Sequence, residues 1–121
     1  ATFTKAILIG HYNKLLLDEG ALLLGETYLR DLRQPDRAIG ALARFLKRQR
    51  TSLLCDDALL LMAEASLARH QPPAPEDQRS ACEYLDRLRR EYPDGNRVRR
   101  AGELQTQLRC PQPTAPTTGA P

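Results

Sequence analysis

The sequence predicts an all-α protein built from antiparallel helix pairs, and three observations lead to this expectation. Good helix formers dominate the composition, whereas aromatic residues make up only 5% and Trp is missing. Barrels and sandwiches of β-strands normally use more aromatic and β-branched residues than this. Apolar residues recur at helical spacing along most of the chain. A block of sequence also repeats within the chain, which is typical of stacked helical units.

Length and charge narrow the classes of function. The 121 residues suffice for one domain with a modest core. No apolar stretch approaches the roughly 18–20 residues of a spanning helix, so we expect no transmembrane segment. A net charge of +3 is too mild to imply nucleic-acid binding by itself. No aromatic residues alternate with the arginines for base stacking, which argues further against nucleic acid.

Breakers divide the helical pattern into segments. Pro35 follows the second segment, three prolines within 72–75 follow the fourth, and the turn at 92–96 follows the fifth. The first two segments form either one long helix or two helices broken near 18–20. The predicted helices, about five or six in all, cover 3–17, 18–32, 35–49, 53–69, 76–91 and 97–108. The second segment has an apolar stripe that we expect to be buried, formed by Leu22, Leu24, Gly25, Tyr28, Leu29 and Leu32.

The predicted organisation is an N-terminal helix at 1–17, repeats over 18–109 and a disordered tail rich in Pro and Thr at 110–121. The repeats would comprise two units, at about 18–50 and 53–93, and a capping helix at 97–108. The evidence for two units is a match between residues 22–29 and 60–67 at an offset of 38 residues. Small residues then recur where two helices must approach closely, namely Gly25 and Ala63 on the first helices and Ala38 and Ala81 on the second.

These blocks resemble the tetratricopeptide repeat family. Unit one supplies the motif residues Leu24, Gly25, Tyr28, Ala38, Leu42 and Phe45, and unit two supplies Met62, Ala63, Ser66, Ala81, Leu85, Leu88 and Pro93. The resemblance covers roughly residues 18–108 and implies a short right-handed superhelix of stacked helix pairs. Ser66 replaces the usual aromatic residue, Arg50 stands where a closing Pro is expected, and unit two is stretched at Pro72–Asp77.

A narrower resemblance is to bacterial envelope repeat proteins, such as outer-membrane assembly lipoproteins and periplasmic partners of the Tol system. It rests on the opening Asp56-Asp57-Ala58-Leu59 and the ending Tyr92-Pro93-Asp94-Gly95. The strong preference for Arg over Lys also favours a bacterial source with GC-rich codons. The compartment stays open between the envelope and the cytoplasm.

In the family, partners lie in a concave groove lined by the first helix of each pair. Carried over by position, this implies a partner-binding groove at Glu19, Leu22, Glu26, Leu29, Arg30, Asp57, Leu60, Glu64, Leu67 and Ala68. Four of these residues are acidic and one is basic, which favours an extended or helical partner segment with apolar and basic residues. The alternative is that the acids are only a solvated face.

Positive charge gathers elsewhere. Residues 30–50 carry seven basic and two acidic groups, and the basic second helices are expected to face the convex side. Six arginines further on could bind phosphates or anionic lipid headgroups, or could be solvated or paired with neighbouring acids: Arg87, Arg89, Arg90, Arg97, Arg99 and Arg100.

The three cysteines have no metal-binding spacing. Small unpaired thiols are the interpretation that Cys55, Cys82 and Cys110 favour, with a Cys82–Cys110 disulfide in an oxidising compartment as the alternative. Neither His11 nor His70 has a His or Cys partner three or four residues away, so no metal and no cofactor is expected.

No catalytic motif accompanies the repeats, so the prediction is a protein without enzymatic activity. The first hypothesis is a protein–protein interaction module that acts as a scaffold or adaptor. The second is a structural oligomerisation domain of a larger protein, because a stack of two units leaves apolar surface at its ends and copies could pair.

Overall fold

The computed structural model describes residues 18–111, and in this part of the chain the fold is all-α without strands. Residues 18–26 are α-helical and continue into the π-helical turn η1, Thr27–Asp31; together they are called helix 18–31 below. The helices that follow are α2 (Pro35–Arg48), α3 (Cys55–Ala68), α4 (Pro75–Glu91) and α5 (Val98–Leu108). The predicted helix at 1–17 and most of the predicted tail, 112–121, lie outside the described residues.

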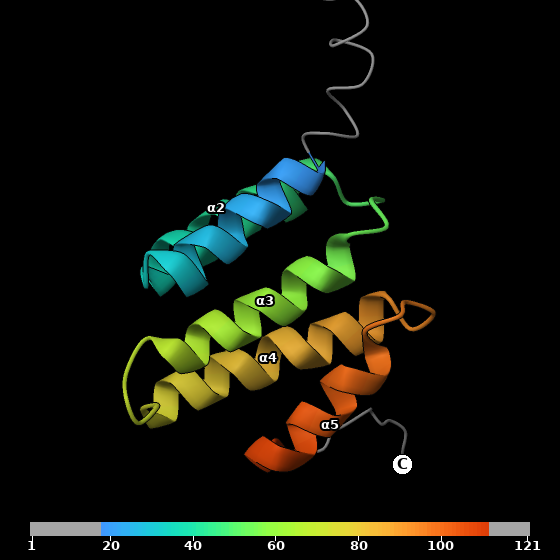
Figure 1. Ribbon diagram of the computed structural model, residues 1–121. Coiled ribbons are helices and arrows are strands. Elements are labelled where there is room, and N and C mark those ends of the chain that lie inside the picture. The colour runs from blue at the N-terminus through green and yellow to red at the C-terminus, as the bar shows by residue number, and fades with distance from the viewer. Residues whose placement is uncertain (1–17, 112–121) are drawn as a thin grey trace, which may run out of the picture.

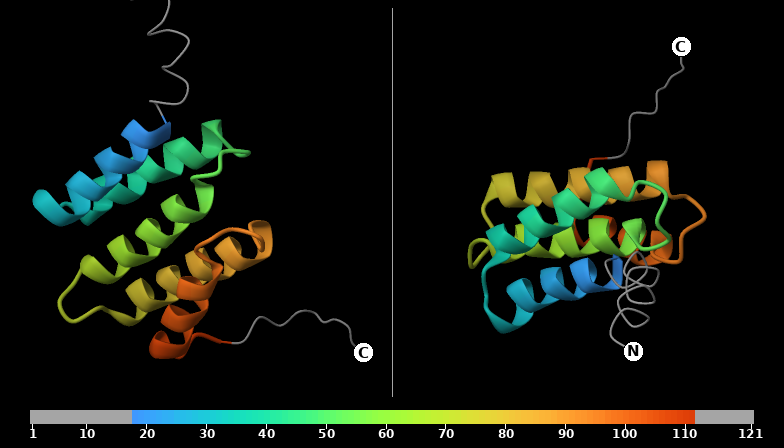
Figure 2. Two further views of the ribbon diagram at one scale, coloured as in Figure 1. Left: turned by 45° about the vertical axis from the view of Figure 1, so that its right-hand side comes forward. Right: turned by 90° about the horizontal axis from the view of Figure 1, so that it is seen from above.

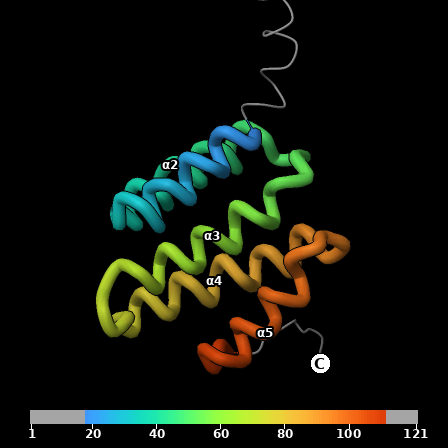
Figure 3. The backbone as a smooth tube through the Cα atoms, in the orientation of Figure 1, coloured from blue at the N-terminus to red at the C-terminus, as the bar shows by residue number. Residues whose placement is uncertain are grey.

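Successive helices lie side by side in chain order (Figure 1). Successive loops alternate between the two ends of the helices, so neighbouring helices run antiparallel (Figure 3). Two turned views show that the helices also cross one another rather than lying in one plane (Figure 2). This arrangement of stacked antiparallel pairs is the fold class that the sequence predicts.

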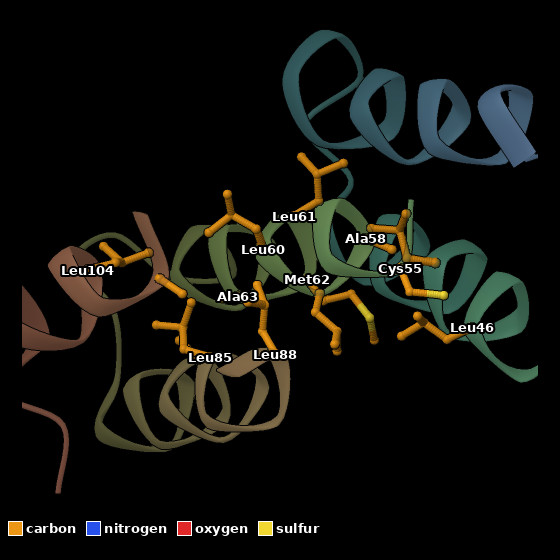
Figure 4. Close-up of a cluster of buried hydrophobic side chains, with 14 of the residues drawn as sticks. Leu46, Cys55, Ala58, Leu60, Leu61, Met62, Ala63, Leu85, Leu88 and Leu104 are labelled. Carbon is orange, nitrogen blue, oxygen red and sulfur yellow. The ribbon is translucent and has the colours of Figure 1, made fainter. Parts of the chain in front are cut away.

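Helix α3 forms the centre of the core. Ten of its fourteen residues are buried, so it is apolar on nearly every side, as expected for a helix covered by neighbours all round. The side chains of Leu60 and Leu61 project from one side of α3, while Leu85 and Leu88 of α4 pack against its other side (Figure 4). The cluster also includes Leu42, Phe45 and Leu46 of α2 and Ala101 and Leu104 of α5.

Small residues allow the helices to approach closely, as the sequence predicts. Ala38, Ala63 and Ala81 are fully buried. At Gly25 a Cβ atom would lie 2.7 Å from Cδ2 of Leu42, a side chain that is itself fully buried. A larger residue at this position would therefore have to displace Leu42, and glycine allows helix 18–31 to pack closely against α2.

Two leucines of the predicted buried stripe are exposed, which corrects the sequence-based expectation. Leu24 is 45% exposed and Leu32 is 52% exposed. Helix 18–31 contacts its neighbours along one edge, through Ala21, Leu22, Gly25 and Leu29. The π-turn then changes the register, because the N–H of Leu32 bonds to the carbonyl of Thr27 five residues back. The simple 3.6-residue period therefore fails at Leu32.

The α3–α4 connection is anchored by a buried carboxylate. Asp77 Oδ2 accepts the N–H of Ala74 at 3.0 Å, which caps the start of α4, and lies 2.6 Å from His70 Nδ1. Burial alone would raise the pKa of Asp77, but hydrogen bonds from His70 and Ala74, with the positive charges of protonated His70 and of Arg69, lower it. The stretched segment of unit two is thus a fixed connection that begins α4 at Pro75, one residue before the predicted start.

The cysteines correct a second expectation. Cys82 of α4 and Cys110, just after α5, form a disulfide with a Cα–Cα distance of 5.6 Å. Unpaired thiols were the favoured interpretation for these two positions, and it is wrong. Cys55 alone remains free and buried, with its thiol 2.9 Å from the carbonyl of Gln49. Burial raises the pKa of the Cys55 thiol.

Candidate functional site: a groove between three helices

A groove of about 410 Å³ opens between helix 18–31, α3 and α5. Its apolar lining comes from Leu22 on the first helix and from Leu60 and Leu61 on the central one. Three carboxylates and three guanidinium groups complete the lining: Glu26, Asp57, Glu64, Arg30, Arg97 and Arg100. The groove therefore combines three leucines from two helices with charged side chains of both signs in equal number.

The lining joins residues that are distant in sequence. Arg30 lies between two carboxylates, with Nη2 3.2 Å from Glu64 Oε1 and Nε 3.8 Å from Glu26 Oε2. This pairing links the first helices of the two units across an offset of 34 residues. Because the side chains are largely exposed, the pairs stabilise the fold only slightly, by about 0.5 kcal/mol each. Their main consequence is that Glu26 and Glu64 already share a cationic partner, Arg30.

A buried aspartate of α3 positions α5, which forms one side of the groove. Asp56 Oδ2 accepts the N–H of Arg97 at 3.2 Å, directly before α5 begins. A Cβ at Gly95 would lie 2.4 Å from that same oxygen, so glycine is required where the turn passes the carboxylate. Asp56 thus fixes the start of α5 against α3.

The next residue along, Asp57, faces the groove. On a helix, adjacent side chains point about 100° apart, so Asp56 holds the backbone while Asp57 pairs with the Arg97 guanidinium. This hydrogen bond and the negative charge of Asp57 raise the pKa of Arg97. Asp57 therefore stabilises the charged form of the Arg97 guanidinium.

The structure brings together six of the residues that the sequence assigned to a groove: Leu22, Glu26, Arg30, Asp57, Leu60 and Glu64. Leu29 and Leu67 do not line the groove, and both pack against the core cluster. Glu19 and Ala68 are also outside the lining, and Glu19 is exposed. Six of the ten residues that the sequence assigned to the groove therefore line it, and four lie outside its lining.

Sequence reasoning missed Leu61, Arg97 and Arg100, which also line the groove. From the sequence, the two arginines were expected to bind phosphates or anionic headgroups, or to be solvated or paired with neighbouring acids, and not to line the groove. They line the groove because α5 lies beside α3 in the position of the first helix of a further unit. The available signal was the arginine spacing of three residues, which places both side chains on one side of the chain at the start of α5.

The described residues, 18–111, contain neither a helix long and apolar enough to cross a membrane nor a group of three or more His, Cys, Asp or Glu that could hold a metal ion.

The chain matches the family model described as Tetratricopeptide repeat, over residues 19–52 and 57–95. The two matched segments together cover more than half of the chain and contain helix 18–31 to α4. No significant match was found among curated proteins or among solved structures. The chain therefore belongs to the tetratricopeptide repeat family, whose repeats generally mediate protein–protein interaction.

Proposed function

We propose that this chain is a scaffold or adaptor that holds a segment of a partner protein in the groove between helix 18–31, α3 and α5. The observation that carries the proposal is the combination of an apolar surface, formed by Leu22, Leu60 and Leu61, with charged side chains around it. Binding sites for protein segments typically combine apolar anchoring with polar groups that fix orientation. A groove of about 410 Å³ fits a few side chains of such a segment.

The charges of the groove define the kind of segment. All three carboxylates of the lining already face arginines, so a basic partner residue must displace Arg30 or Arg97 to pair with them. Basic residues alone therefore add little affinity, because each new ion pair replaces an existing one. We expect a segment anchored by apolar side chains and flanked by charges of both signs. This refines the apolar and basic segment that the sequence predicted.

The disulfide supports an oxidising compartment as the place where this scaffold acts. Disulfides form and persist in oxidising compartments, such as the bacterial periplasm and the extracellular space. The Cys82–Cys110 bond is therefore consistent with the envelope role that the narrower family resemblance implies.

The proposal can be tested with peptides selected from a random displayed library on the immobilised chain. Selected peptides are titrated against the wild type and against Glu26→Lys/Glu64→Lys, which surrounds Arg30 with like charge. We expect affinity to fall at least about tenfold, because like charges brought together in an interface are costly. The matched control is Glu76→Lys/Glu83→Lys, which makes the same charge change at two exposed positions of α4 outside the groove. Peptides that bind both variants equally well would contradict the groove as the binding site.

A second candidate function is self-association as a structural module. Leu23 is 63% exposed and Leu24 is 45% exposed on the outer side of helix 18–31. Adjacent exposed leucines at the end of a repeat stack are the kind of surface through which copies pair. Sedimentation of the wild type over a range of concentrations tests this function directly. A dimer that Leu23→Gln/Leu24→Gln converts to a monomer would support it, and a monomeric wild type would exclude it.

A further inference from the structure

Several basic residues of α4 and α5 differ in their pairing from those of α2. In α4 and α5, Arg87, Arg90 and Arg99 pair with carboxylates three or four residues away on their own helix. In and just after α2, five exposed cations form no ion pair within the described residues: Arg37, Arg44, Lys47, Arg48 and Arg50. These five residues are called the α2 cationic face.

The cations of this face form a row. Arg37, Arg44 and Arg48 are seven and four residues apart, which places them on one stripe of the helix. The row spans roughly 16 Å at the helical rise of 1.5 Å per residue. The single acidic residue of α2, Asp36, pairs with Arg69 at 2.9 Å and so does not neutralise the row. A row of this kind matches an extended anionic surface better than a single small anion.

A depression lies at the C-terminal end of the row. It has a volume of about 270 Å³ and is lined by Lys47, Arg50 and Arg87 over the buried side chains of Leu46 and Met62. The hydroxyl of Tyr92 donates a hydrogen bond to the carbonyl of Arg50 at 3.2 Å, which holds the Arg50 backbone in place. Lys47 and Arg50 form no ion pair within the described residues and are suited to a phosphate group, whereas Arg87 already pairs with Glu91.

The loop beside this depression exposes a leucine. Leu53 is 93% exposed, and it lies three residues from Arg50, within about 11 Å along the chain. The sequence predicted Leu53 as the first residue of a helix, but α3 begins only at Cys55, which leaves Leu53 in the loop. An exposed apolar side chain that follows Arg50, the last cation of the α2 cationic face, within a few residues supplies the second of the two forces that bind proteins to membrane surfaces.

We propose that the α2 cationic face, together with Leu53, adsorbs to a membrane surface of anionic lipids. The cations contact the headgroups and Leu53 enters the apolar layer beneath them. This surface is separate from the groove, so the inference does not depend on the proposed function. A nucleic acid would use the cations but has no apolar layer for Leu53 to enter.

The test measures binding of the purified chain to vesicles of phosphatidylcholine with phosphatidylglycerol and to vesicles of phosphatidylcholine alone. We expect binding to the anionic vesicles only, weakening as salt is added. Each cation near an anionic surface strengthens adsorption roughly fivefold. Arg44→Glu/Arg48→Glu is therefore expected to weaken it at least about 25-fold, and Leu53→Asp about tenfold.

The control variant is Arg90→Glu/Arg99→Glu. It makes the same change of net charge on α4 and α5, at side chains that are 66% and 94% exposed. It is expected to bind within about threefold of the wild type, because those charges lie outside the α2 cationic face. Circular dichroism confirms that each variant is folded, which is expected because every substituted residue is exposed.

Three results would overturn the proposal. The first is no adsorption to anionic vesicles at low salt. The second is equal weakening by the α2 variant and the control variant, which would mean that net charge alone acts. The third is binding to double-stranded DNA that is as tight as binding to the vesicles, with Leu53→Asp weakening neither. This result would assign the α2 cationic face to soluble polyanions.

Discussion

The two helices that flank α3 in the groove, helix 18–31 and α5, are held to the stack by different means. Helix α5 buries Ala101 and Leu104, exposes polar residues on its outer side and is tied to α4 by the Cys82–Cys110 disulfide. Helix 18–31 has no covalent tie within the described residues and leaves Leu23 63% exposed. One wall of the groove is thus fixed by a covalent bond and the other by close packing.

The packing of helix 18–31 depends on a few specific contacts. Gly25 allows it to approach Leu42, Ser52 donates a hydrogen bond to Asp18 at 2.8 Å, and Arg30 pairs with Glu64. The hydrogen bond and the ion pair are individually weak. The difference between the walls indicates that the groove is most adjustable on the side of helix 18–31. Binding of a partner segment is then expected to change helix 18–31 more than α5.

The largest expected effect comes from removing the covalent tie. Cys82→Ser/Cys110→Ser should lower the free energy of unfolding by about 3 kcal/mol, because the disulfide closes a loop with a sequence separation of 28 residues. Urea denaturation measures this difference. Hydrogen exchange should show α5 opening more readily than α3, since a helix of 11 residues is marginal without its neighbours. An unchanged unfolding curve would show that packing alone holds α5.

A somewhat smaller effect is expected at the other wall. Gly25→Val should destabilise the fold by about 2 kcal/mol, because the new side chain overlaps the buried Leu42. Gly20→Val is the matched control in the same helix, where nothing lies within 4 Å of an added Cβ. The control should unfold like the wild type or be slightly more stable. Equal midpoints of thermal unfolding for both variants would refute the close-packing account of this wall.

The smallest effect should come from the outer side of helix 18–31. Leu23→Gln/Leu24→Gln is expected to change the free energy of unfolding of the monomer by less than about 0.5 kcal/mol, because both side chains are exposed. Leu104→Ala on α5 should instead cost about 2 kcal/mol, since Leu104 is buried in the core cluster. Chemical denaturation at low protein concentration measures both. A large loss in the Leu23/Leu24 variant would show that this face is packed in solution.

The sequence predicted the helices well where the repeat governs their packing. Gly25, Ala38, Ala63 and Ala81 were identified from repeat positions, and the structure buries all four at close helix approaches. The all-α fold and the approximate helix bounds followed from apolar spacing and from prolines. Leu24 and Leu32 were misplaced because helical period alone reveals neither which edge of an outer helix is covered nor where a π-turn changes the register.

The site was predictable in part for the same reason. Glu26, Arg30 and Glu64 occupy matching faces of two repeated helices, so repeat register placed them near one another. Arg97 and Arg100 lie at the start of α5, which is not part of a complete repeat. The spacing of the repeats therefore could not predict their position. The disulfide depends on how α5 lies against α4, which cysteine spacing alone could not determine.

The most direct test of the account is nuclear magnetic resonance mapping of a selected peptide on the isotope-labelled chain. If the groove holds the partner segment, amide shifts concentrate at residues that line it, including Leu22, Leu60, Leu61, Glu64, Arg97 and Arg100. The account also predicts larger shifts along the rest of helix 18–31 than along the rest of α5, because only α5 is covalently tied. Shifts confined to the α2 cationic face or to Leu23 and Leu24, with the groove lining unchanged, would contradict the groove as the partner-binding site.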